Sequence, residues 1–191
     1  MKLKKLKLHN FRGYTSEEFD LDEDMNVIIG RNDVGKSTVL DALEIFFNGD
    51  NKECQVKIEV DDFNVHCREE EKEIRIACCF DTEDKNVLID STNRTNLKEE
   101  YLLNEDGLLE IVKVWNCSKT KIGASDLKIY LCAHYPEVFD KPLVNLKISD
   151  LKKKLDNIKE DLPDYDKINK SKSADIRKAL YKHYINDKCT L

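Results

Sequence analysis

The sequence has few of the residues that interrupt or cross-link a chain. Three prolines and six glycines occur in 191 residues, and the seven cysteines include no Cys-x-x-Cys pair. An odd number of cysteines without paired spacing argues against a disulfide framework and against a zinc site. His66 and Cys67 resemble half of a metal site together with Cys54, but no matching second pair follows. We therefore expect reduced thiols and a cytoplasmic protein.

Long hydrophobic runs are also absent, because no apolar stretch approaches the ~20 residues of a membrane helix. Residues 1–8 alternate lysine and leucine, which predicts a strand with Leu6 and Leu8 inward rather than a signal peptide. The formal net charge of −6 argues against binding nucleic acid by bulk charge alone. We expect a globular domain with no membrane partner.

A phosphate-binding pattern is present in the first fifty residues. The segment Gly30-x-x-x-x-Gly35-Lys36-Ser37 is a full Walker A motif. Its glycines let backbone N–H groups turn toward one point, where the N-terminus of the following helix adds a partial positive charge. Lys36 can reach the β- and γ-phosphates, and the Ser37 hydroxyl can ligate Mg²⁺. The motif therefore predicts nucleotide binding with Mg²⁺.

The flanking sequence places this motif between a strand and a helix. The apolar run 27–29 predicts a buried strand, and the helical pattern over 36–48 stops before Gly49. Strand, glycine loop and helix are the three parts of a phosphate cradle. A strand-to-helix turn without function would not need a lysine and a serine at these two positions.

The first fifty residues resemble the ATP-binding heads of the SMC, RecF and OLD-type ATPases of the ABC superclass. Those heads open with a strand ending in Asn-Phe-Arg, here residues 10–12, and continue with a similar glycine loop and an Ala-Leu helix, here 42–43. Asp33-Val34 is more similar to the OLD-type nuclease and phage-defence ATPases. The resemblance implies an α/β P-loop NTPase core of the ABC head type, with an antiparallel β subdomain and a C-terminal helical segment.

The resemblance also implies a site for ATP. Backbone N–H groups from Asp33 to Thr38 are expected to wrap the phosphates, and Asn32 is expected beside the γ-phosphate. Arg12 is expected to approach the phosphate or the base, and its alternative role is that of a surface residue at a strand end. The predicted nucleotide-binding residues are Arg12, Gly30, Asn32, Asp33, Val34, Gly35, Lys36, Ser37 and Thr38, with Ser37 also on Mg²⁺.

Periodicity and turn residues organise the rest of the chain. We expect residues 1–145 to form the ATP-binding α/β lobe and residues 146–191 to form a helical extension. The pair Asp106-Gly107 is a strong signal for a hairpin turn. The predicted elements are strands over 2–10, 14–21, 25–29, 55–60, 73–80 and 86–90, a hairpin over 100–115, a strand or helix start over 126–133, and helices over 146–163 and 173–187.

Other elements of an ABC-type head are missing from the sequence. Gln55 is the only glutamine and follows Ser37 too closely to be the glutamine that contacts Mg²⁺. The best candidate for a strand ending in catalytic acids leads to Asp81 and Glu83, but its alternation is typical of an antiparallel strand. We therefore expect the N-terminal part of a longer ATPase, which by itself hydrolyses ATP slowly or not at all.

Three classes of function remain open. The resemblance implies heads that form ATP-dependent homodimers, with DNA or a nuclease as partner, in DNA repair or antiviral defence. A self-contained small P-loop kinase or NTPase is the second class, although 51–54 and 169–172 both lack the Asn-Lys-x-Asp pattern of a GTPase. The third class is an interaction module that binds nucleotide without hydrolysing it. Phosphoryl transfer to small acceptors would favour the second class, and binding without turnover the third.

Overall fold

The computed structural model describes residues 1–29, 35–49, 56–67, 72–83, 87–90, 93–136, 138–184 and 189–190. The chain divides into two compact units, which are described separately here. Unit 1 comprises residues 1–82 and 110–131, and unit 2 comprises residues 83–109 and 132–191. The lobes predicted from the sequence, with their boundary at 145, remain a proposal about the organisation of the protein.

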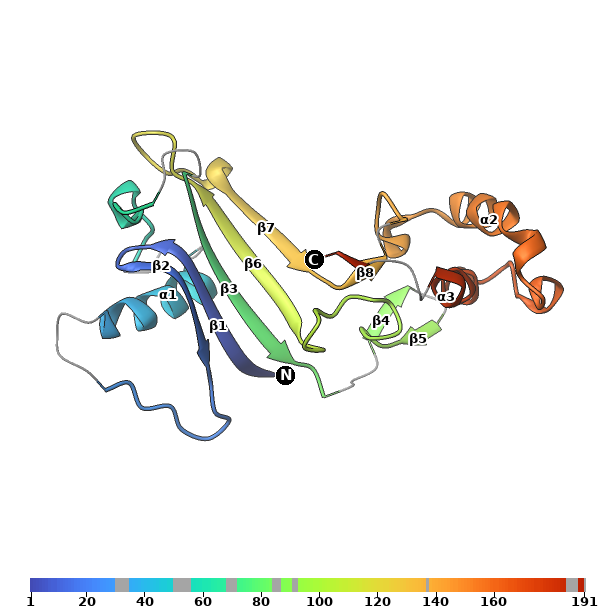
Figure 1. Ribbon diagram of the computed structural model, residues 1–191, viewed down its shortest axis with the longest axis horizontal. Helices are drawn as coiled ribbons and strands as arrows, with labels where there is room; N and C mark the ends of the chain where they lie inside the picture. The colour runs from blue at the N-terminus through green and yellow to red at the C-terminus, as the bar shows by residue number, and fades with distance from the viewer. Residues whose placement is uncertain are drawn as a thin grey trace. The chain divides into compact units, whose positions relative to one another are not determined.

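A five-stranded sheet is the frame of unit 1 (Figure 1), with the strands in the order β2-β1-β3-β6-β7. Strand β1 is antiparallel to both β2 and β3. The Cys117 N–H donates to the Lys72 carbonyl at 2.8 Å, so the end of β6 meets the start of β3 and this pair is antiparallel too. The strands are β1 (Lys2–Phe11), β2 (Tyr14–Asp20), β3 (Glu73–Asp81), β6 (Leu109–Asn116) and β7 (Leu127–Cys132).

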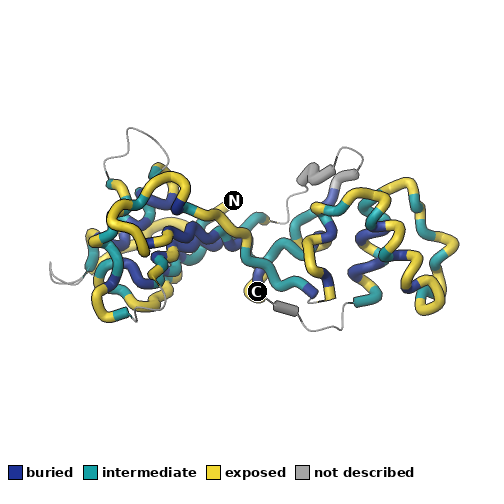
Figure 2. The backbone as a smooth tube through the Cα atoms, turned by 90° about the horizontal axis from the view of Figure 1, so that it is seen from above, coloured by how far each residue is buried: buried dark blue, intermediate teal, exposed yellow. Residues whose placement is uncertain are grey.

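One face of this sheet packs against helix α1 (Lys36–Asn48), and the core of unit 1 lies between them. Alternate residues of β1 and β3 face the helix, as the pairs Leu6–Cys78 and Leu8–Ile76 show. All four side chains are at most 1% exposed, and Figure 2 shows the buried stretches of the strands in dark blue. The period of two in the sequence therefore produces a half-buried antiparallel sheet.

The opposite face of the sheet carries charged side chains. Lys7 Nζ on β1 lies 3.8 Å from a Glu18 oxygen on the adjacent strand β2 and 3.1 Å from a Glu110 oxygen on β6, the strand beyond β3. Burial raises the pKa of the thiols of Cys78 and Cys79 to about 12. Both cysteines therefore stay protonated at neutral pH and behave as small apolar residues.

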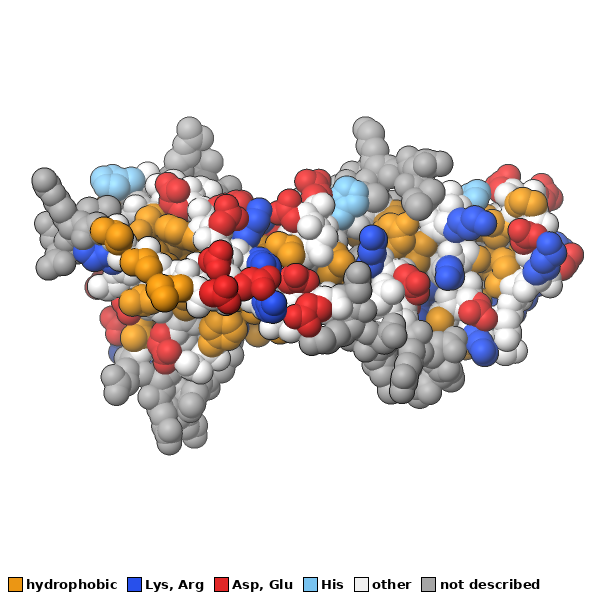
Figure 3. Space-filling view, turned by 90° about the horizontal axis from the view of Figure 1, so that it is seen from below, with side chains coloured by type: hydrophobic (Ala, Val, Ile, Leu, Met, Phe, Trp, Pro, Cys, Tyr) orange, Lys and Arg blue, Asp and Glu red, His pale blue; other side chains and the backbone are white. Residues whose placement is uncertain are grey.

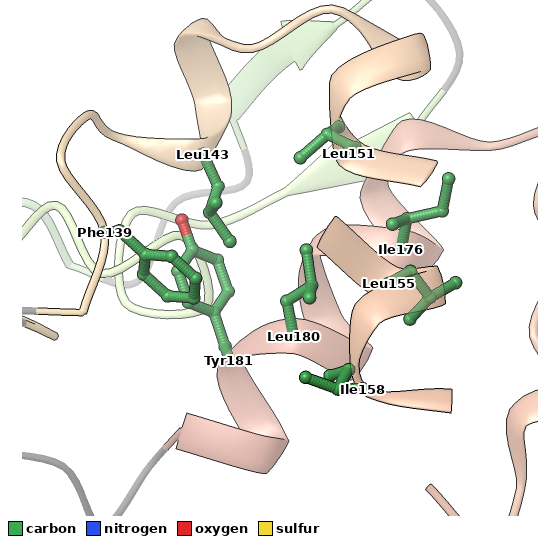
Figure 4. Packing of buried hydrophobic residues seen from close by; sticks show 8 residues of the cluster. All are labelled: Phe139, Leu143, Leu151, Leu155, Ile158, Ile176, Leu180 and Tyr181. Carbon is green, nitrogen blue, oxygen red and sulfur yellow. The ribbon is translucent and has the colours of Figure 1, made fainter. Parts of the chain in front are cut away.

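Helices α2 (Ile148–Asn157) and α3 (Ser173–Tyr184) build the core of unit 2 (Figure 4). The buried cluster consists of Phe139, Leu143, Leu151, Leu155, Ile158, Ile176, Leu180 and Tyr181. Unit 2 also contains two short strand pairs, β4 (Val87–Asp90) with β5 (Asn93–Thr95) and β8 (Tyr135–Pro136) with β9 (Cys189–Thr190).

A buried ion pair lies beside this cluster. Arg177 donates from Nε and Nη2 to the two carboxylate oxygens of Glu100, both at 2.8 Å, and the two side chains are 3% and 4% exposed. The Tyr181 hydroxyl donates to the Glu100 carbonyl at 3.2 Å. These bonds satisfy polar groups that would be costly to bury alone.

Most predicted elements are present within a few residues of their expected bounds, including both N-terminal strands, the helix over 36–48 and the strand over 73–80. The segment 126–133 is a strand, and the predicted turn at Asp106-Gly107 is present with Gly107 at φ 74°. Short 3-10 turns occur at Val60–Asp62, Ala124–Asp126, Leu143–Asn145, Lys159–Asp161 and Tyr165–Lys167.

The predicted central strand over 25–29 is wrong, because these residues form no strand in the structure. Val27 is 68% and Ile29 is 88% exposed. Within the described ranges, no strand pairs with this segment, since β2 and β7 form the edges of the sheet. An apolar run becomes a buried strand only where neighbouring strands satisfy its backbone and cover its side chains.

Three smaller predictions also differ from the structure. Residues 56–59 form no strand, and the segment continues into the 3-10 turn of Val60–Asp62, where Asp62 accepts the Glu59 N–H at 2.8 Å. The first arm of the predicted hairpin over 100–115 is a turn, and its Glu100 is paired with Arg177. Helix α2 ends at Asn157, before Pro163, and continues as a 3-10 turn.

Candidate nucleotide-binding site

The start of helix α1 is the described part of the predicted phosphate cradle. Gly35 is the residue before the helix and has the left-handed backbone angles φ 77° and ψ 15°. No side chain caps this end of α1, and its first turn contains no acidic residue. The first N–H groups of an α-helix have no acceptor within the helix, so they and the helix dipole favour an anion here.

Tyr14 on β2 holds Gly35 in this position. The Tyr14 hydroxyl donates to the Gly35 carbonyl at 3.3 Å, and the Tyr14 ring meets the Phe19 ring edge-on at 5.5 Å between centroids. A Cβ added to Gly35 would lie 2.8 Å from the Tyr14 hydroxyl oxygen. Both the positive φ and this close approach require glycine at position 35.

Arg12 lies beside helix α1 in the turn between β1 and β2. Its Nε donates to Asp62 Oδ1 at 2.7 Å, and its Nη1 donates to Asp41 Oδ2 on α1. Burial lowers the Arg12 pKa, but the hydrogen bonds to the two carboxylates outweigh burial and raise that pKa above its ordinary value. Arg12 is therefore a cation held by two carboxylates next to the helix that begins at Lys36.

The residues at the start of α1 differ in their exposure. Lys36 is half-buried, Ser37 is exposed and Thr38 is buried. A primary amine, a hydroxyl and successive backbone N–H groups at a helix N-terminus form a donor set that suits a triphosphate with its Mg²⁺. The groups present here therefore fit ATP and Mg²⁺, and Lys36 and Ser37 are the residues that could contact the phosphates and the metal ion.

The remaining residues of the predicted loop are Gly30, Asn32, Asp33 and Val34, and they lie outside the described residues. The ligand roles assigned to them, and those assigned to Gly35, Lys36, Ser37, Thr38 and Arg12, remain predictions.

The strand that leads to the catalytic candidate Asp81 meets the last turn of α1. The ring of Phe80 meets that of Phe47, in the last turn of α1, at 6.2 Å between centroids. Ser37 lies ten residues before Phe47, about 15 Å away along the helix axis. Asp81 follows Phe80 and is therefore near the opposite end of the helix, while Glu83 is exposed and belongs to unit 2.

The possible metal site near His66 and Cys67 has another explanation. The Cys67 thiol donates to Asn10 Oδ1 at 2.5 Å, and the His66 N–H donates to Asn64 Oδ1 at 2.8 Å. In the part of the chain that the structure describes, no three His, Cys, Asp or Glu side chains are grouped so as to hold a metal ion. Across the same residues, no helix has the length and apolar character needed to span a membrane.

A comparison with known families decides the class of this protein. The sequence profile of the AAA ATPase domain family matches residues 1–190. The chain belongs to this family. Its fold is that of an α/β P-loop NTPase with a mixture of helices and antiparallel strands, as the sequence predicted.

Individual relatives of this ATPase domain are similar over parts of their length. The DNA double-strand break repair Rad50 ATPase of Archaeoglobus fulgidus is 40% identical over 47 residues, which are 25% of this chain and 5% of that protein. The head domain of SMC from Thermotoga maritima gives a TM-score of 0.42 at 15% identity, over 90% of this chain and 54% of that one. A second SMC ATPase structure, from work on ATP-driven dimerization and DNA-stimulated activation, gives 0.47 at 19% identity over 70% of each chain.

Sequence reasoning missed the partners of the predicted site residues. Asp41 and Asp62, which bind Arg12, and Tyr14, which binds Gly35, were not identified as functional residues. Asp62 is fifty residues from Arg12 in the chain, and no periodicity or spacing links the two. A contact at this separation depends on the sheet, and one sequence alone carries no signal for it.

Proposed function

We propose that this ATPase domain binds Mg-ATP at the start of α1, as part of an SMC-, RecF- or OLD-like ATPase. The observation that carries the proposal is the left-handed Gly35 placed before Lys36 and Ser37, at a helix end without a capping side chain. Lys36 would contact the β- and γ-phosphates, and the Ser37 hydroxyl would hold Mg²⁺. The metal ion would neutralise part of the phosphate charge.

The proposal includes assembly and a cellular role, which rest on the resemblance to SMC, RecF and OLD-type heads. Two heads would associate around two nucleotides as a homodimer, and this association would be coupled to DNA processing, with DNA or a nuclease as partner. DNA repair and anti-phage defence are the two settings that fit this resemblance, and the OLD-like loop pair Asp33-Val34 favours defence.

We also propose that the second half of the head comes from a further segment of the protein. Apolar side chains lie exposed on both sides of the phosphate loop, at Val27 and Ile29 before it and at Leu40 and Phe47 after it. Figure 3 shows one face of the molecule, on which hydrophobic side chains reach the surface among acidic and basic ones. Strands from the second half would cover residues of this kind and supply a catalytic acid.

Calorimetric titration of the chain with Mg-ATP tests the nucleotide site. Lys36→Ala should abolish measurable binding, because the lysine supplies the positive charge for the β- and γ-phosphates, and its melting temperature should stay close to that of the unchanged chain. Lys121→Ala is the matched control, since Lys121 is an exposed lysine of unit 1 away from the loop. Equal affinities of Lys36→Ala and the unchanged chain would refute the assignment.

A turnover assay tests the statement about catalysis. The chain should release phosphate from Mg-ATP far more slowly than the ~1 s⁻¹ at the lower end of ordinary enzymes. The reason is that Asp41, the acid one helical turn after Ser37 on α1, already accepts a hydrogen bond from Arg12 and is therefore engaged elsewhere. Turnover at about 1 s⁻¹ or faster would show that the catalytic acid is within this chain, and Asp81 and Glu83 would be the first residues to change.

A further inference from the structure

The inference concerns Asp62 and rests on the proposed function, in which Arg12 contacts ATP. Arg12 has a left-handed backbone angle, φ 50°, which is uncommon for any residue other than glycine. Its backbone N–H donates to the Asp62 carbonyl at 2.6 Å, and its Nε donates to the Asp62 carboxylate. Asp62 therefore fixes both the backbone and the side chain of Arg12.

Asp62 is itself held in place. Its second carboxylate oxygen, Oδ2, accepts the Glu59 N–H at 2.8 Å, which closes a capping box over the 3-10 turn Val60–Asp62. The following residues pair with β1, since the Asn64 N–H donates to the Asn10 carbonyl at 3.0 Å and Phe63 forms a β-bridge with Phe11. The carboxylate that faces Arg12 therefore belongs to a segment anchored on the sheet.

The second carboxylate on Arg12 comes from helix α1. Asp41 lies five residues after Lys36, about 7.5 Å along the helix axis from the predicted phosphate ligand. The hydrogen bonds among the described residues use Nε and Nη1 of the guanidinium, and the N–H groups of Nη2 are left for a phosphate oxygen. Arg12 is 29% exposed in its side chain, so a ligand can reach it.

We propose that Asp62, together with Asp41, is a positioning residue that orients Arg12 toward the nucleotide. Asp62 contacts no phosphate in this proposal and acts through Arg12 alone. A cation that is already oriented loses less side-chain freedom when it binds a phosphate than a free arginine does. Loss of the Asp62 carboxylate should therefore weaken ATP binding, although it also removes a negative charge.

The test compares Asp62→Asn with Asp61→Asn in calorimetric titrations of the full chain with Mg-ATP. Asparagine presents one carbonyl oxygen, so it cannot accept from both Glu59 and Arg12. Asp62→Asn should bind Mg-ATP about three- to tenfold more weakly, which corresponds to the cost of ordering one long side chain. Asp61 is an exposed acid of the same turn, and Asp61→Asn should bind equally well or slightly more tightly because repulsion is reduced.

Two further variants separate positioning from general stability. In an Arg12→Ala background, Asp62→Asn should cause no additional loss of affinity, whereas a purely structural role would weaken binding in both backgrounds. Asp41→Asn should also weaken binding, and it leaves the 3-10 turn untouched. Trp115, the single tryptophan, is buried in unit 1, and its fluorescence in thermal unfolding reports whether each variant is folded.

The outcomes distinguish this inference from the proposed function. If Asp62→Asn and Asp61→Asn bind Mg-ATP equally well while Lys36→Ala does not bind, the inference is overturned and the proposed function stands. An additional loss in the Arg12→Ala background would also overturn it. If the unchanged chain does not bind Mg-ATP, the proposed function is contradicted and the inference fails with it.

Discussion

Among the described residues, unit 2 exposes few large apolar side chains, Val138 and Ile148, whereas unit 1 leaves many of them in solvent. Leu155 of α2 and Leu180 of α3 are 0% exposed, and the Arg177–Glu100 pair beside them is fully hydrogen-bonded. In unit 1, helix α1 buries one face against the sheet, but Leu40 on its other face is 60% exposed. The comparison teaches that helix α1 buries one face while apolar side chains on its other face stay exposed among the described residues, which is the basis of the proposed second contact.

The ion pair of unit 2 should give the largest effect on stability. Arg177→Ala leaves the Glu100 carboxylate buried without its partner, and breaking a buried pair in this way costs about 3–5 kcal/mol. Chemical denaturation followed by circular dichroism measures the change, with Lys178→Ala as the control, because Lys178 is the exposed cation next in the helix. A loss in the free energy of unfolding below about 1 kcal/mol would show that the Arg177–Glu100 pair is more accessible to water than its contacts indicate.

Substitutions of two leucines compare the buried core of unit 2 with the exposed face of α1. Leu155→Ala removes a fully buried side chain and should destabilise unit 2 by about 2–5 kcal/mol. Leu40→Ala changes an exposed leucine on α1 and should alter stability by less than about 0.5 kcal/mol. Denaturation curves recorded by circular dichroism and by Trp115 fluorescence give both values. A large loss in Leu40→Ala would mean that this helix face is already covered in solution.

Gly35 tests the backbone of the candidate site. Gly35→Ala forces a left-handed residue and a contact with the Tyr14 hydroxyl, and it should cost about 1–2 kcal/mol and weaken Mg-ATP binding. Gly13→Ala is the control, because a Cβ there meets no atom within 4 Å. Trp115 fluorescence and calorimetry measure the two effects. Equal behaviour of the two variants would contradict the conformation described for Gly35.

Titration of the buried thiols of unit 1 has no effect at neutral pH and a gradual effect at alkaline pH. The pKa values of Cys78 and Cys79 are raised from 9 to about 12, so the folded state keeps protons that the unfolded state loses. Their contribution to stability is complete below pH 9 and is lost as the pH rises from 9 toward 12. The melting temperature of unit 1, recorded by Trp115 fluorescence, should fall over this pH range. If the melting temperature of the unchanged chain does not fall between pH 9 and pH 12, the raised pKa values of the two thiols are contradicted.

Elements governed by local pattern were predictable from the sequence. Strands β1 and β3 follow from alternation, and α1 follows from its helical period and the glycine after it. The fold class also followed from the Walker A motif before α1 and from the Asn-Phe-Arg segment at the end of β1, and the family match over residues 1–190 agrees with it. These features depend on short stretches of chain, so one sequence contains the information they need.

Features that depend on distant partners were not predictable. The apolar run 25–29 has the composition of a buried strand, yet it needs neighbouring strands to become one. The segment 55–60 alternates, but Asp62 and its capping box favour a 3-10 turn there. Glu100 occupies a predicted strand position, and its pairing with Arg177 across 77 residues overrides that preference.

Hydrogen exchange with and without Mg-ATP tests the central claim most directly, because it reads both units of the full chain in one experiment. The account predicts that ATP slows exchange in peptides containing Gly35 to Asp41 and in the turn containing Arg12. It predicts no change in helix α3, whose core is closed without a ligand. Unchanged exchange at the start of α1, or protection confined to α3, would contradict the assignment of the nucleotide site to unit 1.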